Sequence, residues 1–250
     1  MKEEFFIGWA DPGPGTRRNF LGLAIAATAL GIGAAAAMGR FSMPPGDGHW
    51  DSEDVRIFNG VASLDPYPML RTLDDEGRPR TYLLASQGKC GVASRIRAYA
   101  DQPARLRGSL LKRGDHAMIA LADGPDWMET LHGKVDPRLA IPPDQLLQDV
   151  SVTGEILDAK CWYGAMRPGH GKPHKACATL CIRSGLPPAL FVHGRDARLH
   201  PVLLTSSTGA SANALVLPYI GEGVSVSGTL VQRGDLLLLR LAARASIAFL

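Results

Sequence analysis

The sequence predicts a mainly β protein in which two tandem OB-like small barrels follow one N-terminal helix. Two observations carry the barrels: the chain repeats itself at a spacing of 120 residues, and each copy consists of short strand-like runs separated by turn residues. A third observation, an uncharged apolar stretch near the start, carries the helix. The predicted parts are a cytoplasmic segment (1–18), a transmembrane anchor or signal helix (19–39), a tether (40–49), the first barrel (50–124), a linker (125–147) and the second barrel (148–250).

The N-terminal stretch predicts export. Thr16-Arg17-Arg18-Asn19-Phe20-Leu21 resembles a twin-arginine signal, and the run that follows is rich in Ala, Gly, Leu and Ile. Arginines before an apolar helix keep its N-terminus in the cytoplasm. We therefore expect an anchor in the bacterial inner membrane, retained rather than cleaved, with residues 40–250 in the periplasm. An ordinary membrane anchor that begins with two arginines is the alternative.

The repeat defines the barrels. Residues 68–122 align with 188–242 without a gap, and 14 of the 55 positions are identical. Both copies contain Gly-x-Leu-x-x-Arg-Gly-Asp, in which Arg-Gly-Asp is typical of a hairpin turn between the last two strands. Gly108 and Gly228, inside strands, indicate bulges or barrel corners. A short helix is expected before each final hairpin, and five strands with one short helix fit a closed OB barrel.

An insertion at 159–187 interrupts the second copy and holds three of the four cysteines. His174-x-x-Cys177-x-x-x-Cys181 has helical spacing, so the three side chains can share one face of a helix that ends at Ser184-Gly185. Cys161 can close the set from the other side, and three thiolates with one imidazole suit structural zinc. We predict a metal site made by Cys161, His174, Cys177 and Cys181, with His170 as a further candidate ligand.

Other chemistries for these cysteines stay open. In an oxidising compartment Cys161 could form a disulfide with Cys177 or Cys181, whereas two cysteines four apart on a helix converge poorly. Copper, iron or thiol redox chemistry is a third interpretation. Cys90, in the first copy, is expected to be a small buried side chain, or else to join a second bridge that staples the barrels.

The insertion is also basic, since no acid occurs between Lys160 and Arg195. Its cations could moderate the charge of a thiolate site or hold an anionic ligand or partner. They are Lys160, Arg167, Lys172, Lys175 and Arg183.

The second half resembles uncharacterised bacterial exported and membrane-anchored proteins. Their pattern runs Gly-Glu-Val-x-Asp-x-x-Cys-Tyr, a Gly-rich loop, His-x-x-Cys-Ala-x-x-Cys and Gly-x-Pro. It is matched here by Gly154-Glu-Ile-Leu-Asp158, Cys161, His174, Cys177-Ala178, Cys181 and Gly185-Leu-Pro187, with Trp162 in place of the usual Tyr. The resemblance implies an architecture and brings no activity with it.

The function is predicted from the Cys/His insertion together with the motifs that the sequence lacks. The sequence contains no haem, Rieske, thioredoxin, phosphate-loop or hydrolase motif, which favours a non-enzymatic role. A net charge of +3 and strands without a row of exposed aromatics predict no nucleic-acid partner. We expect a membrane-anchored periplasmic accessory protein of a membrane redox complex, bound to the membrane by its helix and to a protein partner in the inner membrane or periplasm. The alternatives are a periplasmic thiol-redox or copper/electron-transfer protein and a disulfide-stapled binding module.

Overall fold

The computed structural model describes residues 14–41, 48–193, 199–242 and 246–250, in two units that comprise Met1–Gly46 and Asp47–Leu250. The first unit contains one helix, α1 (Pro14–Phe41). Among the described residues, no helix is long and apolar enough to cross a membrane. Helix α1 covers the anchor or signal helix predicted at 19–39, and its place in a membrane stays a prediction. The cellular compartment stays a prediction.

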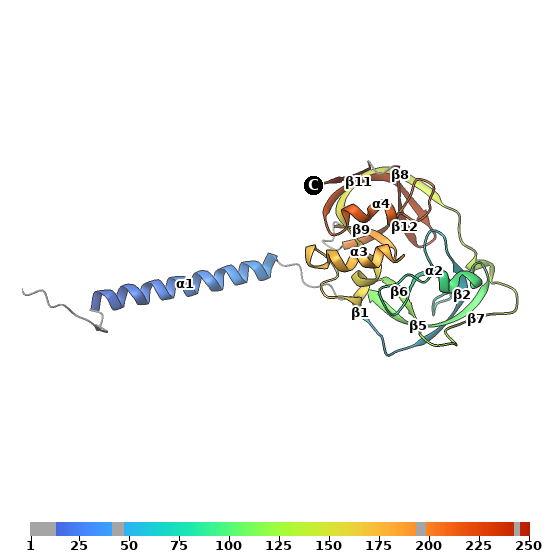
Figure 1. Cartoon of the computed structure of the whole chain (residues 1–250), viewed down its shortest axis with the longest axis horizontal. Helices are drawn as coiled ribbons and strands as arrows, with labels where there is room; N and C mark the ends of the chain where they lie inside the picture. The colour runs from blue at the N-terminus through green and yellow to red at the C-terminus, as the bar shows by residue number, and fades with distance from the viewer. Residues whose placement is uncertain (1–13, 42–47, 194–198, 243–245) are drawn as a thin grey trace, which may run out of the picture. The chain divides into compact units, whose positions relative to one another are not determined.

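The second unit begins with a closed five-stranded barrel (Figure 1). Its strands pair in the order β2-β3-β4-β6-β5, and β5 returns to β2 to close the ring. All these pairs are antiparallel except β4 with β6. The strands are β2 (Arg56–Ser63), β3 (Met69–Leu73), β4 (Pro79–Ala85), β5 (Pro103–Arg113) and β6 (His116–Leu121). The short helices α2 (Ala93–Ile96) and η1 (Arg97–Tyr99) lie between β4 and β5, while β1 (His49–Trp50) and β7 (Met128–Thr130) extend the sheet along β5.

The second barrel repeats this topology. Its strands pair in the order β8-β9-β10-β12-β11, β11 closes onto β8, and β10 with β12 is again the parallel pair. The strands are β8 (Gln145–Asp158), β9 (Pro188–His193), β10 (Leu199–Thr205), β11 (Gly223–Arg233) and β12 (Leu236–Leu241). Helices α4 (Asn213–Val216) and η5 (Leu217–Tyr219) precede β11, and β13 (Ile247–Phe249) pairs with it. The short 3-10 helix η2 (Pro137–Leu139) lies between the barrels in sequence.

These two closed barrels confirm the predicted pair of OB-like barrels. Each Arg-Gly-Asp turn has its glycine at positive φ, +55° at Gly114 and +58° at Gly234, where other residues are strained. Gly108 and Gly228 occupy equivalent points of β5 and β11. A Cβ at Gly108 would meet the carbonyl oxygen of Ala120 at 2.6 Å, so close strand packing explains the repeated glycine.

The insertion lies between β8 and β9. It consists of the π-helical turn η3 (Cys161–Ala165), the 3-10 turn η4 (Lys172–His174) and the helix α3 (Lys175–Arg183). Helix α3 ends where the sequence predicts, at Ser184 and Gly185, whose φ is +99°. The backbone N–H of Leu186 then donates to the carbonyl of Cys181 at 3.0 Å, which satisfies one of the last carbonyls of the helix.

The barrels share an apolar core. Ile119 and Leu121 of β6 pack inside the first barrel, whereas the alternate residues Met118 and Ala120 join a cluster with β9, β10 and the insertion. Strand β6 is therefore buried on both faces, which accounts for its unbroken apolar run.

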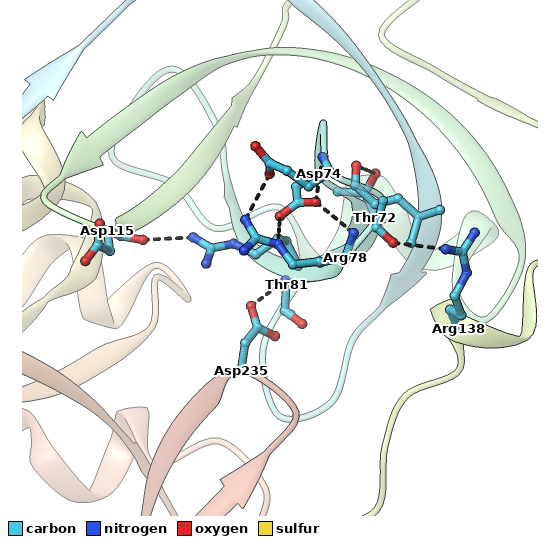
Figure 2. Close-up of polar contacts among 11 residues, drawn as sticks. Thr72, Asp74, Arg78, Thr81, Asp115, Arg138 and Asp235 are labelled. Carbon is cyan, nitrogen blue, oxygen red and sulfur yellow. Dashed lines mark hydrogen bonds and ion pairs between the residues drawn. The ribbon is translucent and has the colours of Figure 1, made fainter.

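Polar contacts also join the barrels. Figure 2 shows Asp235, from the β11–β12 turn, accepting a hydrogen bond of 2.8 Å from the backbone N–H of Thr81 in β4. Tyr67, buried in the loop after β2, donates its hydroxyl to the carbonyl of Leu204 and accepts from the N–H of Ala212 at 3.0 Å. The insertion therefore packs within a single unit formed by both barrels.

Candidate metal centre

Cys161 is positioned by the residue that ends β8. The Oδ1 atom of Asp158 accepts the backbone N–H of Cys161 at 2.8 Å, three residues on, as a helix-capping side chain does. Asp158 is fully buried. Trp162 and Tyr163, which follow Cys161, are also buried, and the Trp162 ring centroid lies 4.5 Å from that of Phe191. The turn that carries Cys161 is therefore fixed on both sides by packing and by a hydrogen bond.

Three thiols converge between η3 and α3. The Sγ atom of Cys161 lies 3.9 Å from that of Cys177 and 4.0 Å from that of Cys181. A disulfide requires about 2.05 Å, so these sulfurs are not bonded, and all four cysteines are free. Thiolates bound at ~2.3 Å to one tetrahedral zinc stand roughly 3.8 Å apart. The measured spacing fits a shared metal ion, and we call Cys161, Cys177 and Cys181 the thiol centre.

His174 lies on the other side of Cys161, in a buried pair with Asp158. Its Nε2 atom is 3.0 Å from Oδ2 of Asp158, and both side chains are fully buried. Its other ring nitrogen, Nδ1, is buried without a hydrogen-bond partner in the described part of the chain. Metal-bound histidines commonly donate their second ring N–H to a carboxylate. Asp158 therefore orients the ring through Nε2 and leaves Nδ1 as the ring nitrogen that could bind a metal.

The predicted four ligands do not form a single group. Ligand atoms of the three cysteines lie within 4.8 Å of one another, and those of Asp158, Cys161 and His174 form a second group at the same limit. Cys161 belongs to both groups. The hydrogen bond to Asp158 explains why His174 sits against Cys161 rather than midway among the sulfurs. His170, the further candidate ligand, is half-buried and belongs to neither group.

Two residues of this site were missed as site residues by sequence reasoning. Asp158 has a recognisable signal, an acid three residues before the first cysteine of a helical turn. Lys89, on the first barrel, has none, because the contact spans 88 positions of the chain. Its ammonium group is near enough to the Cys177 thiol for that thiol to raise the pKa of Lys89.

The protons of the thiol centre are unequally held. The hydrogen bond with Cys181, followed by burial, raises the pKa of Cys161, and the same hydrogen bond lowers the pKa of Cys181. Burial raises the pKa of Cys177, and the nearby Lys89 opposes that shift. Cys161 therefore holds its proton more strongly than Cys181 does.

The basic residues of the insertion are partly engaged within the protein. Lys160 is buried and donates to three carbonyls of the first barrel, and Arg167 donates to the carbonyl of Gly48 at 2.9 Å. Lys172 and Lys175 form ion pairs with Glu222 at 3.4 and 2.6 Å. Glu222 directly precedes β11, so a carboxylate from outside the insertion balances part of its positive charge. Arg183, at the end of α3, is exposed.

Cys90 is exposed, and the expectation that it is buried is wrong. It belongs to loop 86–91, between β4 and α2, which faces the second barrel mainly with its backbone carbonyls and with Lys89. The side chain of Cys90 is consequently left in solvent. No disulfide joins the described cysteines, so the predicted staple between barrels is absent as well.

Comparisons with known proteins give few matches. No protein-family model matches the sequence, and no curated protein matches it. Among solved structures, the crystal structure of a deletion mutant of the single-stranded DNA binding protein from Thermus aquaticus is 13% identical, with a TM-score of 0.24. The match covers 82% of this chain and 87% of that one.

This match corrects one expectation from the sequence. The prediction of no nucleic-acid partner was wrong as an exclusion, because a protein titled single-stranded DNA binding protein is among the matching structures. A modest net charge and few exposed aromatics do not rule that partner out for barrels of this kind. At this TM-score the match adds no positive argument about the ligand of the present chain.

Proposed function

We propose that the protein is a metal-binding protein whose thiol centre holds one zinc-like ion beside His174. The observation that carries the proposal is the spacing of the sulfurs, 3.9 and 4.0 Å from Cys161, which is too long for a disulfide and close to the edge of a metal–thiolate tetrahedron. The buried, unpartnered Nδ1 of His174 supports a nitrogen ligand as the fourth.

When bound, such an ion would supply a cross-link between two elements of the insertion. Cys161 starts η3, and Cys177 and Cys181 lie on α3, which is only nine residues long. A nine-residue helix is marginal by itself, so a metal that ties it to η3 would contribute directly to the stability of the insertion. The chain's own residues prepare the site, because Asp158 fixes both the Cys161 turn and the His174 ring.

The test compares two cysteine substitutions in the full chain. Cys177→Ser should remove the bound metal and lower the melting temperature, because it deletes one of three thiolate ligands. Cys90→Ser changes the exposed cysteine that directly follows Lys89 and should keep one metal per chain. Metal content is measured by elemental analysis of protein purified without metal-affinity resin. Equal metal content in Cys177→Ser and the unaltered protein would contradict the proposal.

A second candidate function is transfer of copper. Cys177 is only half-buried, whereas Cys161 and Cys181 are buried, so the thiol centre is reachable at one edge. A three-thiolate set suits Cu(I), and a reachable edge suits exchange more than permanent storage. Recovery of one copper in place of zinc, lost in Cys177→Ser and kept in Cys90→Ser, would favour this candidate over a structural site.

The wider role of accessory protein to a membrane redox complex is a proposal that rests on the metal centre. Its support is the twin-arginine-like segment at 16–21 and a sequence without a catalytic motif. A strain lacking the protein should lose activity of one membrane oxidoreductase and regain it with the unaltered chain but not with Cys177→Ser. Full activity in the deletion strain would contradict this role.

A further inference from the structure

The thiol centre has one accessible edge, and that edge faces the first barrel. Cys161 and Cys181 are buried, while Cys177 is half-buried and lies beside Lys89 of loop 86–91. Among the three cysteines of the thiol centre, Cys177 is the one that is partly exposed to solvent. The lysine beside it belongs to the other barrel from the one that supplies the ligands.

Loop 86–91 is held against the insertion by a buried cation. The Nζ atom of Lys160 donates to the carbonyl oxygens of Ser86, Gln87 and Gly88, each at 2.7 Å. Lys160 directly precedes Cys161 and lies over the ring of Trp50, 4.9 Å from its centroid. Three short hydrogen bonds from one buried ammonium fix the backbone of the loop next to the residue that precedes Cys161, because hydrogen bonds from a charged donor are strong.

The end of α3 holds the other side of the loop. The N–H of Gly91 donates to the carbonyl of Ser184 at 2.9 Å, and the Ser184 hydroxyl donates to the carbonyl of Lys89. The backbones approach so closely that a Cβ at Gly91 would lie 2.8 Å from the Ser184 oxygen. A Cβ at Gly88, in the same loop, would meet nothing within 4 Å. The loop therefore contains one glycine that its docking requires and one that it does not.

Charge explains why Lys89 is placed at the open edge. Three thiolates and a neutral imidazole around a divalent ion leave a net charge of about −1, part of it on the sulfur nearest to solvent. The ammonium of Lys89, in contact with Cys177, offsets this charge from outside the ligand set. A cation there stabilises the metal-bound thiolate against dissociation from the ion.

We infer that loop 86–91 of the first barrel is the gate of the metal centre in the second barrel, with Lys89 as a positioning residue that retains Cys177 on the metal. The inference rests on the proposed metal-binding function. It assigns a shared task to the two barrels: the second supplies the ligands, and the first controls how fast the metal is exchanged.

The test measures metal transfer from the full-length, metal-loaded protein to the neutral chelator tetrakis(2-pyridylmethyl)ethylenediamine, whose lack of charge avoids attraction to Lys89. Gly91→Ala should release metal faster than Gly88→Ala, because only the former pushes the loop away from Ser184. Lys89→Ala should release metal about threefold faster than the unaltered protein, the size expected for an exposed charge contact. Lys89→Arg should restore most of the retention, and Lys134→Ala, which changes an exposed lysine between β7 and η2, should have no effect on the release rate.

The outcomes separate this inference from the proposed function. One metal per chain in every variant, with release accelerated in Gly91→Ala and Lys89→Ala only, supports the gate. One metal per chain with equal release rates in all of them overturns the gate and leaves the metal centre standing. An unaltered protein that binds no metal overturns the proposed function itself. Should Gly91→Ala fold poorly, Lys89→Ala decides the question, since Lys89 is exposed.

Discussion

Single side chains fix how the two barrels meet, and Tyr67 is the clearest case. It projects from a loop of the first barrel, and its hydroxyl bonds both Leu204 of β10 and the N–H of Ala212 before α4. The ring is buried, and burial raises the pKa of Tyr67, so the hydroxyl stays protonated and able to donate. One residue thus satisfies two buried backbone groups of the other barrel.

Tyr67→Phe should therefore destabilise the protein. Removal of the hydroxyl leaves a buried N–H and a buried carbonyl without this partner, at a cost of about 1–3 kcal/mol. Tyr82→Phe is the matched control, because Tyr82 is half-buried and packs its ring on Phe58 at the surface of the first barrel. Urea unfolding measures both. Equal stability of Tyr67→Phe and the unaltered protein would show that the hydroxyl bonds are dispensable.

At the residue scale, the sequence predicts ligand types better than ligand geometry. The spacing of Cys177 and Cys181 places them on one helix face wherever that helix packs, so their convergence follows from local structure. The position of His174 depends on a buried carboxylate sixteen residues earlier, and Lys89 depends on how the barrels dock. Long-range contacts of this kind leave no periodic signal in one sequence.

Among the elements, the segment that enters the second barrel is held by a network of ion pairs. Asp144, just before β8, accepts bonds from Arg233 of β11 at 2.5 and 3.1 Å and from Arg240 of β12 at 2.6 Å. The hydrogen bond from Arg233 lowers the pKa of the Asp144 carboxyl. The folded protein therefore holds this carboxylate more strongly in its charged form than the unfolded chain does.

The network predicts a pH-dependent effect of Asp144→Asn. Because the folded pKa lies below the unfolded value of about 3.9, the carboxylate contributes stability above that value and loses it as pH falls through the folded pKa. Asp144→Asn should cost about 1 kcal/mol at pH 7, and the two proteins should converge as the pH falls below the folded pKa of Asp144. Asp75→Asn, at an exposed turn, serves as the charge control. Thermal unfolding from pH 7 into the acid range measures the difference, and a gap that does not narrow as the pH falls would contradict this assignment.

Secondary-structure elements were predictable where local sequence signals determine them. The Arg-Gly-Asp turns, the short helices and the end of α3 at Gly185 all follow from turn glycines and spacing, and the structure contains each of them. The π-helical turn at 161–165 was not predictable, since it depends on the hydrogen bond from the Cys161 N–H to Asp158 and on the buried contacts of Trp162. Loop 86–91 likewise owes its conformation to Lys160, 69 or more residues later in the chain.

At the scale of the whole second unit, the sequence repeat predicts the strand topology of each barrel but not how the two barrels pack on each other. Internal similarity implies that both copies fold alike, and the strands pair alike in both. The same similarity cannot say which outer face of a barrel is covered. Leu83 and Met118 of the first barrel join the shared core with the second barrel, which makes the two repeats one packed body rather than independent modules.

Because the barrels pack as one body, residues of both barrels lie at the candidate metal centre. The candidate ligands come from the insertion in the second barrel, whereas loop 86–91 of the first barrel lies beside them. A duplicated fold that carries its insertion in one copy only has thus placed the other copy where it can control access. Both the proposed function and the role of loop 86–91 require that a metal binds at the thiol centre.

X-ray absorption at the metal edge of the purified full chain tests that claim most directly. We expect a first coordination shell of three sulfur atoms at about 2.3 Å and one nitrogen at about 2.0 Å. A shell of nitrogen and oxygen alone would contradict it. So would a chain that carries no metal and is lighter by about two hydrogens, the signature of a disulfide.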